Sequence, residues 1–304
     1  MKLNSSNFLE TKMKKTLQSL ALLTSLLAAA SNNLSACDLH GHSGFLPDNK
    51  MSIPVGLKSM GGLTEIQFNK VMDKISSLYS KMVSARGAKL VIERRWTDAT
   101  VNAYAQQNTP GTYTIVMFGG LARHPEVTQD AMALVACHEL GHHLGGAPKK
   151  LAPGNWASNE GQADYWGTMK CLRHYFEGDD QQAALQGLMV PSIVSAKCNA
   201  QYSNSEEQLV CQRMAMAGAS LAKLLNNVSK DAKASNFATP DKTVVTTTFN
   251  DHPNTQCRLD TFLQASLCDH PIAEVVSDKD ANTGVCSLRN GDRVGNRPLC
   301  WFKP

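Results

Sequence analysis

Residues 127–146 read VTQDAMALVACHELGHHLGG, and this is the most informative stretch of the chain. Pro125 and Asp130 mark a helix start, because proline suits the first turn and a carboxylate suits the positive end of the helix dipole. Gly145 and the glycine after it mark the end of that helix. Residues 127–144 are apolar nearly all round, which is typical of a helix buried in the centre of a domain.

Apolar spacing predicts an α+β fold, mainly helical, around this helix. A stripe of apolar residues at spacings of three to five predicts a helix at 63–85. Runs rich in β-branched and aromatic residues predict strands at 89–96 and 112–118, with a third short strand at 101–105. Further helices are predicted at 158–176, 179–188, 205–227 and 255–267, and residues 271–304 are predicted to be irregular.

The first 36 residues have the order of an export signal. Three lysines precede an apolar run of about 14 residues, which is shorter than the 20 or so that a membrane-spanning helix needs. The run is followed by Leu-Ser-Ala-Cys, which resembles the bacterial lipobox, so that Cys37 would become a lipidated first residue. Simple signal-peptidase cleavage near Ala30 or Ala36 is the alternative. We therefore expect an exported protein that is periplasmic, anchored to a membrane by a lipid, or secreted.

The expected domain organisation follows from this start. We expect a signal peptide at 1–36, a linker or extended arm at 37–62, a main domain at 63–270 and a cysteine-containing extension at 271–304. The 304 residues, 42% of them hydrophobic, are enough to bury a core. The formal net charge is +4, of which the signal residues carry four lysines against one glutamate. The remainder is nearly neutral, which excludes a nucleic-acid partner.

Nine cysteines suit an oxidising compartment, since eight remain for disulfides when Cys37 is set aside. We predict a pair between Cys286 and Cys300. Cys257 and Cys268 are 11 residues apart in one predicted helix, and so about 16 Å apart along its axis. They are too far apart to pair with each other.

Chemistry is concentrated on the central helix. His138 and His142 are one turn apart, so both imidazoles project from one face and can bind one metal ion. Glu139 is rotated by about 100° from His138 and can reach a water on that metal. This arrangement is typical of zinc hydrolases, in which zinc lowers the pKa of the water to about 7 and the glutamate is the general base. We expect one Zn²⁺ per chain.

A third ligand is expected on the next helix. Pro148 stands where the metzincin pattern requires histidine, which excludes that subclass. Glu160 follows His142 by 18 residues, and Asp164 follows Glu160 by one turn. This spacing lets Glu160 bind the metal while Asp164 accepts a hydrogen bond from a histidine ligand. His143 points about 100° away from His142, and we expect no ligand role for it.

These residues resemble the gluzincin metallopeptidases, the family of HtpX, the CAAX prenyl endopeptidases and the soluble periplasmic protease BepA. The resemblance covers roughly residues 64–268. Its matched stretches are VNAYA at 101–105, TIVMFGGL at 114–121, HELGHHLG at 138–145, EGQAD at 160–164, and His252-Pro253 followed by Arg258-Leu259. It implies a zincin-like core with an active-site helix, a glutamate helix and a small sheet whose edge strand lines the cleft.

The resemblance also implies where substrate binds. In that family the strand corresponding to 114–118 is an edge strand to which an extended peptide adds. His252 is expected near the metal, where it either stabilises the oxyanion or caps the zinc in a closed state. The implied substrate-binding residues are Asn102, Ala103, Tyr104, Ile115 and Met117.

The sequence thus predicts a zinc-dependent endopeptidase that cleaves extended proteins or peptides in the cell envelope. The alternative is a zinc-bound chaperone-like or binding protein with a closed site and little turnover, which His252 on the zinc would favour. A third hypothesis is an enzyme that acts on the peptides of the cell wall, and the residues do not distinguish it from the endopeptidase of the first hypothesis. The sequence leaves the oligomeric state open.

Overall fold

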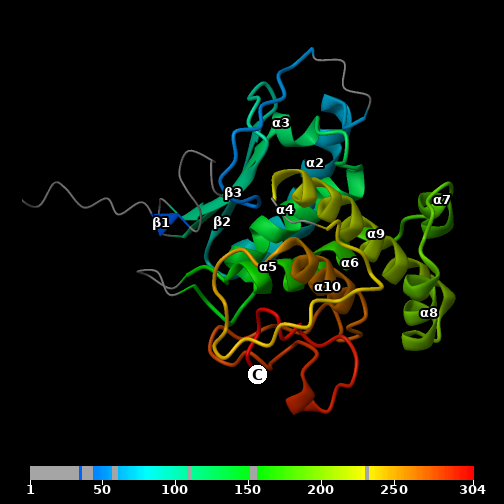
Figure 1. Cartoon of the computed structure of the whole chain (residues 1–304). Helices are drawn as coiled ribbons and strands as arrows, with labels where there is room; N and C mark the ends of the chain where they lie inside the picture. The colour runs from blue at the N-terminus through cyan, green and yellow to red at the C-terminus, as the bar shows by residue number, and fades with distance from the viewer. Residues whose placement is uncertain (1–33, 36–43, 57–60, 108–110, 151–155, 230–232) are drawn as a thin grey trace, which may run out of the picture. The chain divides into compact units, whose positions relative to one another are not determined.

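The computed structural model describes residues 34–35, 44–56, 61–107, 111–150, 156–229 and 233–304 (Figure 1). The fold is α+β and mainly helical, as predicted. Cys37 and nearly all of the predicted signal peptide lie outside the described residues. In the described ranges, no helix is both long enough and apolar enough to cross a membrane.

One sheet has the strand order β1-β3-β4-β2. Strands β3 and β4 form an antiparallel hairpin, and β2 lies parallel to β4 on its other side. The prediction that residues 114–118 form an edge strand is wrong, because β4 has a hydrogen-bonded neighbour on each side. The three predicted strands themselves are confirmed to within two residues. The strands are β1 (Leu34–Ser35), β2 (Lys89–Arg95), β3 (Ala103–Gln107) and β4 (Thr112–Phe118).

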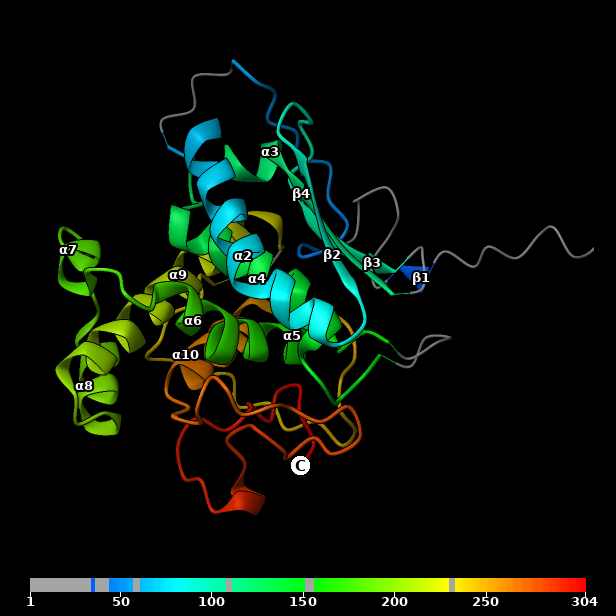
Figure 2. The ribbon, with the colours of Figure 1, turned by 180° about the vertical axis from the view of Figure 1, so that it is seen from behind.

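Helix α4 (Gln129–Leu144) is the central helix that the sequence predicts. The side chain of Thr128 caps its first turn by accepting a hydrogen bond from the backbone of Ala131. Every residue from Ala131 to Leu144 is buried. Helix α4 packs against β3, β4 and α2 (Glu65–Ala85), and Figure 2 shows α2 beside it. Burial on all sides explains why its apolar residues follow no single stripe.

Among the remaining helices, α5, η1 and α9 pack on α4, while α7 and α8 pack on α9. Helices α5, η1 and α6 follow one another directly and make up the segment predicted at 158–176, with one π-helical stretch in its middle. Helix α8 was not predicted, because only Val194 and Cys198 are buried on it, too few for a periodic pattern. These helices are α3 (Gly119–Ala122), α5 (Glu160–Trp166), η1 (Gly167–Leu172), α6 (Arg173–Phe176), α7 (Gln181–Leu185), α8 (Ser192–Gln201), α9 (Ser205–Val228) and α10 (Thr255–Ser266).

Residues 271–304 are irregular apart from a short 3-10 turn, η2 (Leu288–Asn290), as predicted. The predicted Cys286–Cys300 pair is wrong. The extension instead returns along α10, so that Cys300 bonds Cys257 in its first turn and Cys286 bonds Cys268 just after its end. That Cys257 and Cys268 do not pair with each other is confirmed. The other two disulfides are Cys137–Cys171, which joins α4 to η1, and Cys198–Cys211, which joins α8 to α9.

Residues 44–53 form a segment with bends at residues 44–46 and 48, which we call the N-terminal arm. It runs antiparallel to residues 99–103, since the amide of Phe45 donates to Ala103 O and the amide of Ile53 donates to Ala99 O. Phe45 and Leu46 are completely buried in the main core. A segment with no apolar period is therefore part of the folded structure.

Candidate metal centre

Three side chains from two helices converge at one point. His138 and His142 come from α4, and Glu160 is the first residue of α5. One ligand atom from each lies within 4.8 Å of the others. Glu160 carboxylate oxygens lie 3.2 Å from His138 Nε2 and 3.7 Å from His142 Nε2. The three residues that the sequence predicts as ligands are therefore brought together.

A close helix contact makes this convergence possible. Gly141 faces α5, and a Cβ atom there would lie only 2.9 Å from Ala163 O. Any larger residue would push the two helices apart. Asn159 caps α5 by accepting from the backbone of Gln162, which fixes where the helix begins. Glu160 is thus held in the first turn, directly over α4.

Hydrogen bonds fix the tautomer of both histidines. His138 Nδ1 donates to Asp164 Oδ1 at 2.7 Å, and His142 Nδ1 donates to Ser158 O at 2.8 Å. With the proton on Nδ1, Nε2 of a neutral imidazole keeps its lone pair. Burial lowers the pKa of His138, but the negative charges of Asp164 and Glu160 outweigh it and raise that pKa to about 9, so a metal would bind here in exchange for the Nε2 proton. Both lone pairs are directed to the side of Glu160, which is the arrangement a metal requires.

Asp164 is itself held by a buried arginine from α10. Arg258 donates from Nε and Nη2 to the two carboxylate oxygens, each at 2.8 Å. Burial would raise the pKa of Asp164, but the guanidinium and His138 outweigh it and lower that pKa below its usual value. Asp164 therefore stays ionised behind His138.

Five buried lone-pair atoms at this point have no hydrogen-bond partner among the described residues: His138 Nε2, His142 Nε2, Glu160 Oε2 and both carboxylate oxygens of Glu139. All four side chains are fully buried. An unpaired buried polar atom costs on the order of 1–3 kcal/mol, so five together are a large local cost. A cation placed among them would offset it.

The two glutamates differ in protonation. Burial raises the pKa of Glu139 to about 7. Burial acts in the same direction on Glu160, but the charges of His252 and Lys150 outweigh it and hold that pKa well below its usual range. Lys150 Nζ donates to Glu160 Oε1 at 2.6 Å, the oxygen that lies 3.7 Å from His142 Nε2, while Oε2 lies 3.2 Å from His138 Nε2. Glu160 is thus an ionised ligand candidate, while Glu139 can exchange a proton near neutral pH.

His252 lies at the edge of this group and is 11% exposed. Its Nε2 is 3.5 Å from Glu160 Oε2, and it donates to the carbonyl oxygen of Gly44 at 2.5 Å. Its Nδ1 is 2.9 Å from Asp251 Oδ1. In this conformation the imidazole is therefore engaged by the N-terminal arm and does not cap the three ligands.

The five predicted substrate-binding residues are all buried. Asn102 accepts from the Leu46 amide and donates to Leu46 O, while Ala103 O accepts from Phe45. The N-terminal arm therefore already occupies the Asn102 side chain and the carbonyl oxygen of Ala103. Ile115 and Met117 pack in the main core, and their strand is paired on both sides, so they have no edge to which a peptide could add. Tyr104 packs against Phe118.

His143 has a structural environment, in keeping with the expectation that it is no ligand. Its ring is stacked between Tyr113 and Trp156, each at a centroid distance of 4.7 Å. Its Nε2 donates to Thr114 O at 3.1 Å. Two other clusters of potential ligands exist among the described residues, around Asp241 and around His270, but both include cysteines that are committed to disulfides.

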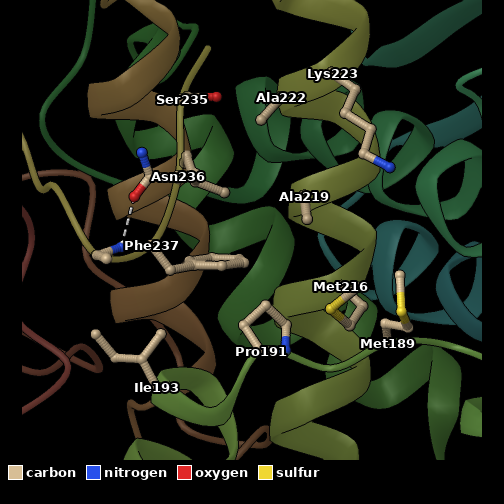
Figure 3. A pocket seen from close by; sticks show the side chains of 12 residues that line it. Met189, Pro191, Ile193, Met216, Ala219, Ala222, Lys223, Ser235, Asn236 and Phe237 are labelled. Carbon is tan, nitrogen blue, oxygen red and sulfur yellow. Dashed lines mark hydrogen bonds between the residues drawn. The ribbon is translucent and has the colours of Figure 1, made fainter.

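An apolar pocket of about 320 Å³ lies away from this chemistry, between α9 and residues 235–238 (Figure 3). Met216, Ala219 and Phe237 line it, together with Met189, which is 92% exposed. None of the candidate metal ligands belongs to its wall. The pocket is therefore separate from the candidate metal centre.

Sequence reasoning missed several residues of the site. Lys150 gave no signal, because a lysine in a loop has no spacing rule that ties it to a carboxylate. Arg258 was noticed only as part of a matched stretch, and its ion pair with Asp164 depends on how α10 packs against α5. Phe45 lies in a segment without periodicity, yet its ring contacts His138 edge-on at 5.1 Å.

No model of a known protein family, no curated protein and no solved structure matches this chain.

Proposed function

We propose that this protein is a zinc-dependent endopeptidase of the gluzincin type, which hydrolyses peptide bonds of extended protein segments in the cell envelope. The observation that carries the proposal is the convergence of the unpaired lone pairs of His138, His142 and Glu160, with the carboxylate of Glu139 beside them. The order of the motifs that resemble the gluzincins supports the same proposal.

Zinc suits this donor set. Two imidazole nitrogens and one carboxylate oxygen are a known set of three protein ligands for catalytic zinc, with bonds of about 2.0–2.2 Å. Ligands of a tetrahedral ion with such bonds are about 3.4 Å apart. Glu160 Oε2 lies 3.2 Å from His138 Nε2, which is close to this value, and the other carboxylate oxygen, Oε1, lies 3.7 Å from His142 Nε2.

The side chains around the ligands divide the work of hydrolysis. A zinc ion, when bound, lowers the pKa of a coordinated water to about 7. Glu139 would accept a proton from the attacking water and deliver it to the leaving amine, and its own pKa of about 7 suits both transfers. His252, which donates from Nε2 to a carbonyl oxygen in this structure, would donate in the same way to the oxygen of the substrate carbonyl.

Four disulfides are consistent with an exported protein, because such bonds persist in oxidising compartments. They support activity outside the cytoplasm. Periplasmic residence and a lipid on Cys37 remain part of the proposal.

The test compares the wild-type protein with Glu139→Gln. Each is loaded with zinc and incubated with unfolded proteins, with and without a chelator, and the new chain ends are sequenced. Wild-type cleavage should stop with chelator and return with zinc, whereas Glu139→Gln should keep its zinc and lose about 10²- to 10⁴-fold in rate. Full activity of the zinc-loaded variant would remove Glu139 as the general base.

A second candidate function is a zinc-binding or chaperone-like protein with little turnover. The burial of all four side chains at the centre favours it, because no protein substrate can reach the ligands in this conformation. The same experiment decides between the two functions: tight zinc binding without any chelator-sensitive cut would favour the second.

A further inference from the structure

The candidate metal centre is closed in this structure. The side chains of His138, Glu139, His142 and Glu160 are all fully buried, and a peptide bond cannot approach them without a movement of whatever covers them. An endopeptidase that acts on proteins must open this site. The residues that cover the centre are therefore informative about its regulation.

Part of the cover is the tip of the N-terminal arm, residues 44–46. The ring of Phe45 packs edge-on against His138 and face-on below the guanidinium of Arg258, at 5.1 and 4.4 Å. Phe45 O accepts from Arg258 Nη1 at 2.6 Å, and Gly44 O accepts from His252 Nε2 at 2.5 Å. The arm tip thus contacts the candidate metal ligand His138, Arg258 behind it, and His252, the histidine expected to stabilise the oxyanion.

The arm tip is a bend, in which the Gly44 amide donates to Leu46 O, and it binds the start of β3 through one backbone bond and one side chain. The Phe45 amide donates to Ala103 O at 2.9 Å, and Leu46 exchanges two hydrogen bonds with the side chain of Asn102. Asn102 and Ala103 lie at the start of β3, ahead of Gln106 and Gln107, where β1 pairs with this strand. They are also the residues at which the sequence predicts substrate to bind.

Gly44 shows how tightly the arm is fitted. A Cβ atom at this position would lie 1.9 Å from Ala103 O, so any other residue would force the arm away from β3. Its φ is not in the left-handed region, so the close approach, and not backbone conformation, requires glycine here.

We propose that Gly44–Leu46 covers the predicted substrate-binding residues Asn102 and Ala103 at the start of β3 and keeps the candidate peptidase closed, so that a peptide must displace this segment to be cleaved. The proposal rests on the proposed function. The carbonyl of Gly44 takes the place of a substrate carbonyl at His252, and the Phe45 side chain fills the space over His138.

Two variants of the full chain test the cover. Gly44→Ala introduces the clash with Ala103 O, and Phe45→Ala removes the ring from His138. Asp48→Ala is the matched control, since this side chain is exposed on the same arm. Two rates are measured: transfer of zinc to an excess of a coloured chelator, which needs no catalysis, and cleavage of unfolded casein. Circular dichroism establishes that each variant is folded.

Both arm variants should raise both rates by at least about tenfold, because a less stable closed state increases the fraction of molecules with an open site. Asp48→Ala should leave both rates unchanged. A synthetic peptide SGFLPDN should slow both rates again in Gly44→Ala, whereas the same peptide with alanine for phenylalanine should not. Folded variants with wild-type rates of metal transfer and cleavage would overturn the proposal.

Hydrogen exchange tests the same idea with an unaltered arm. In zinc-loaded Glu139→Gln, bound casein should speed exchange at the amides of Phe45 and Leu46, and unchanged exchange in that complex would overturn the proposal.

The inference that residues 44–46 close the site and the proposed endopeptidase function can fail separately. If the arm variants transfer zinc faster but neither they nor the wild-type protein cleaves casein, residues 44–46 cover the site and the protein is not an endopeptidase. If the wild-type protein and both arm variants cleave casein at the same rate, the protein is an endopeptidase and these residues do not keep it closed.

Discussion

Arg258 and Asp164 form a bidentate ion pair that is completely buried behind His138. Arg258 Nε and Nη2 each lie 2.8 Å from a carboxylate oxygen, and one of these oxygens also accepts from His138 Nδ1 at 2.7 Å. A buried pair of this kind adds little net stability, but loss of one partner leaves an uncompensated charge. Its value here is in fixing the imidazole of His138.

Asp164→Asn should therefore weaken metal binding. The amide cannot offer a charged acceptor to His138, and loss of such a partner typically costs about 10- to 100-fold in metal affinity. Zinc affinity is measured by competition with a chelator of known strength. Asp260→Asn on α10 is the control, because its carboxylate accepts from Gln256 and from the backbone of Asp241. A folded Asp164→Asn protein with wild-type zinc affinity would contradict the assigned role.

Glu160→Ala should sharply reduce the zinc content, because two histidines alone leave the ion with too few protein ligands. Metal analysis after dialysis against a weak chelator measures the stoichiometry. Glu274→Ala is the matched control, since this glutamate also lies beside a histidine, 2.7 Å from His270 Nδ1. Equal zinc content in both variants would exclude Glu160 from the ligand set.

The sequence predicts the parts of this fold that depend on local pattern. The central helix was predictable because it carries start and stop signals and is apolar on all sides. The pairing of β4 on both sides was not, because the same alternating residues fit an edge strand and an internal one. Disulfide connectivity was not predictable either. Cys286 and Cys300 are consecutive cysteines in the sequence, but their partners depend on how the extension folds back along α10.

The candidate site also contains residues that local spacing predicts and residues that it does not. His138 and His142 are one helical turn apart, so their common face follows from geometry, and Glu160 with Asp164 repeats that spacing. Lys150 and Phe45 reach the site only through tertiary packing, for which no local pattern exists. The arm was predicted as a linker or extended segment, and its burial depends on a glycine that fits against β3.

The Cys257–Cys300 disulfide should support both stability and the metal centre. It anchors Trp301, which is fully buried and donates from Nε1 to Thr261 on α10, the helix that carries Arg258. Replacing both cysteines by serine should cost about 3–4 kcal/mol, as expected for a closed loop of this length. Urea unfolding measures the loss, and chelator competition should show weaker zinc binding.

The Cys198–Cys211 pair provides the control, because it joins α8 to α9. Its double serine variant should lose about 3 kcal/mol, since the loop is shorter, and should keep its zinc affinity. Equal effects of both double variants on zinc would show that the extension has no special role in holding α10.

Lys170 should make the folding stability depend on pH in the alkaline range. This lysine on η1 is 2% exposed and donates to Pro271 O. Burial lowers its pKa to about 8, against about 10.4 in an unfolded chain. Between these values the unfolded chain binds more protons, so the stability of the wild-type protein should rise with pH in this window. Below pH 8 both states are protonated and the cost of burying the charge is fully present.

Lys170→Met removes this titration. Its stability relative to wild type should therefore be most favourable near pH 7 and should decline steadily between pH 8 and 10, as the wild-type protein gains. Urea unfolding at each pH measures the difference. Lys223→Met on α9 is the control, because its side chain is exposed to solvent, and its difference from wild type should stay constant. A constant difference for Lys170→Met as well would mean that Lys170 is not buried as a charged group.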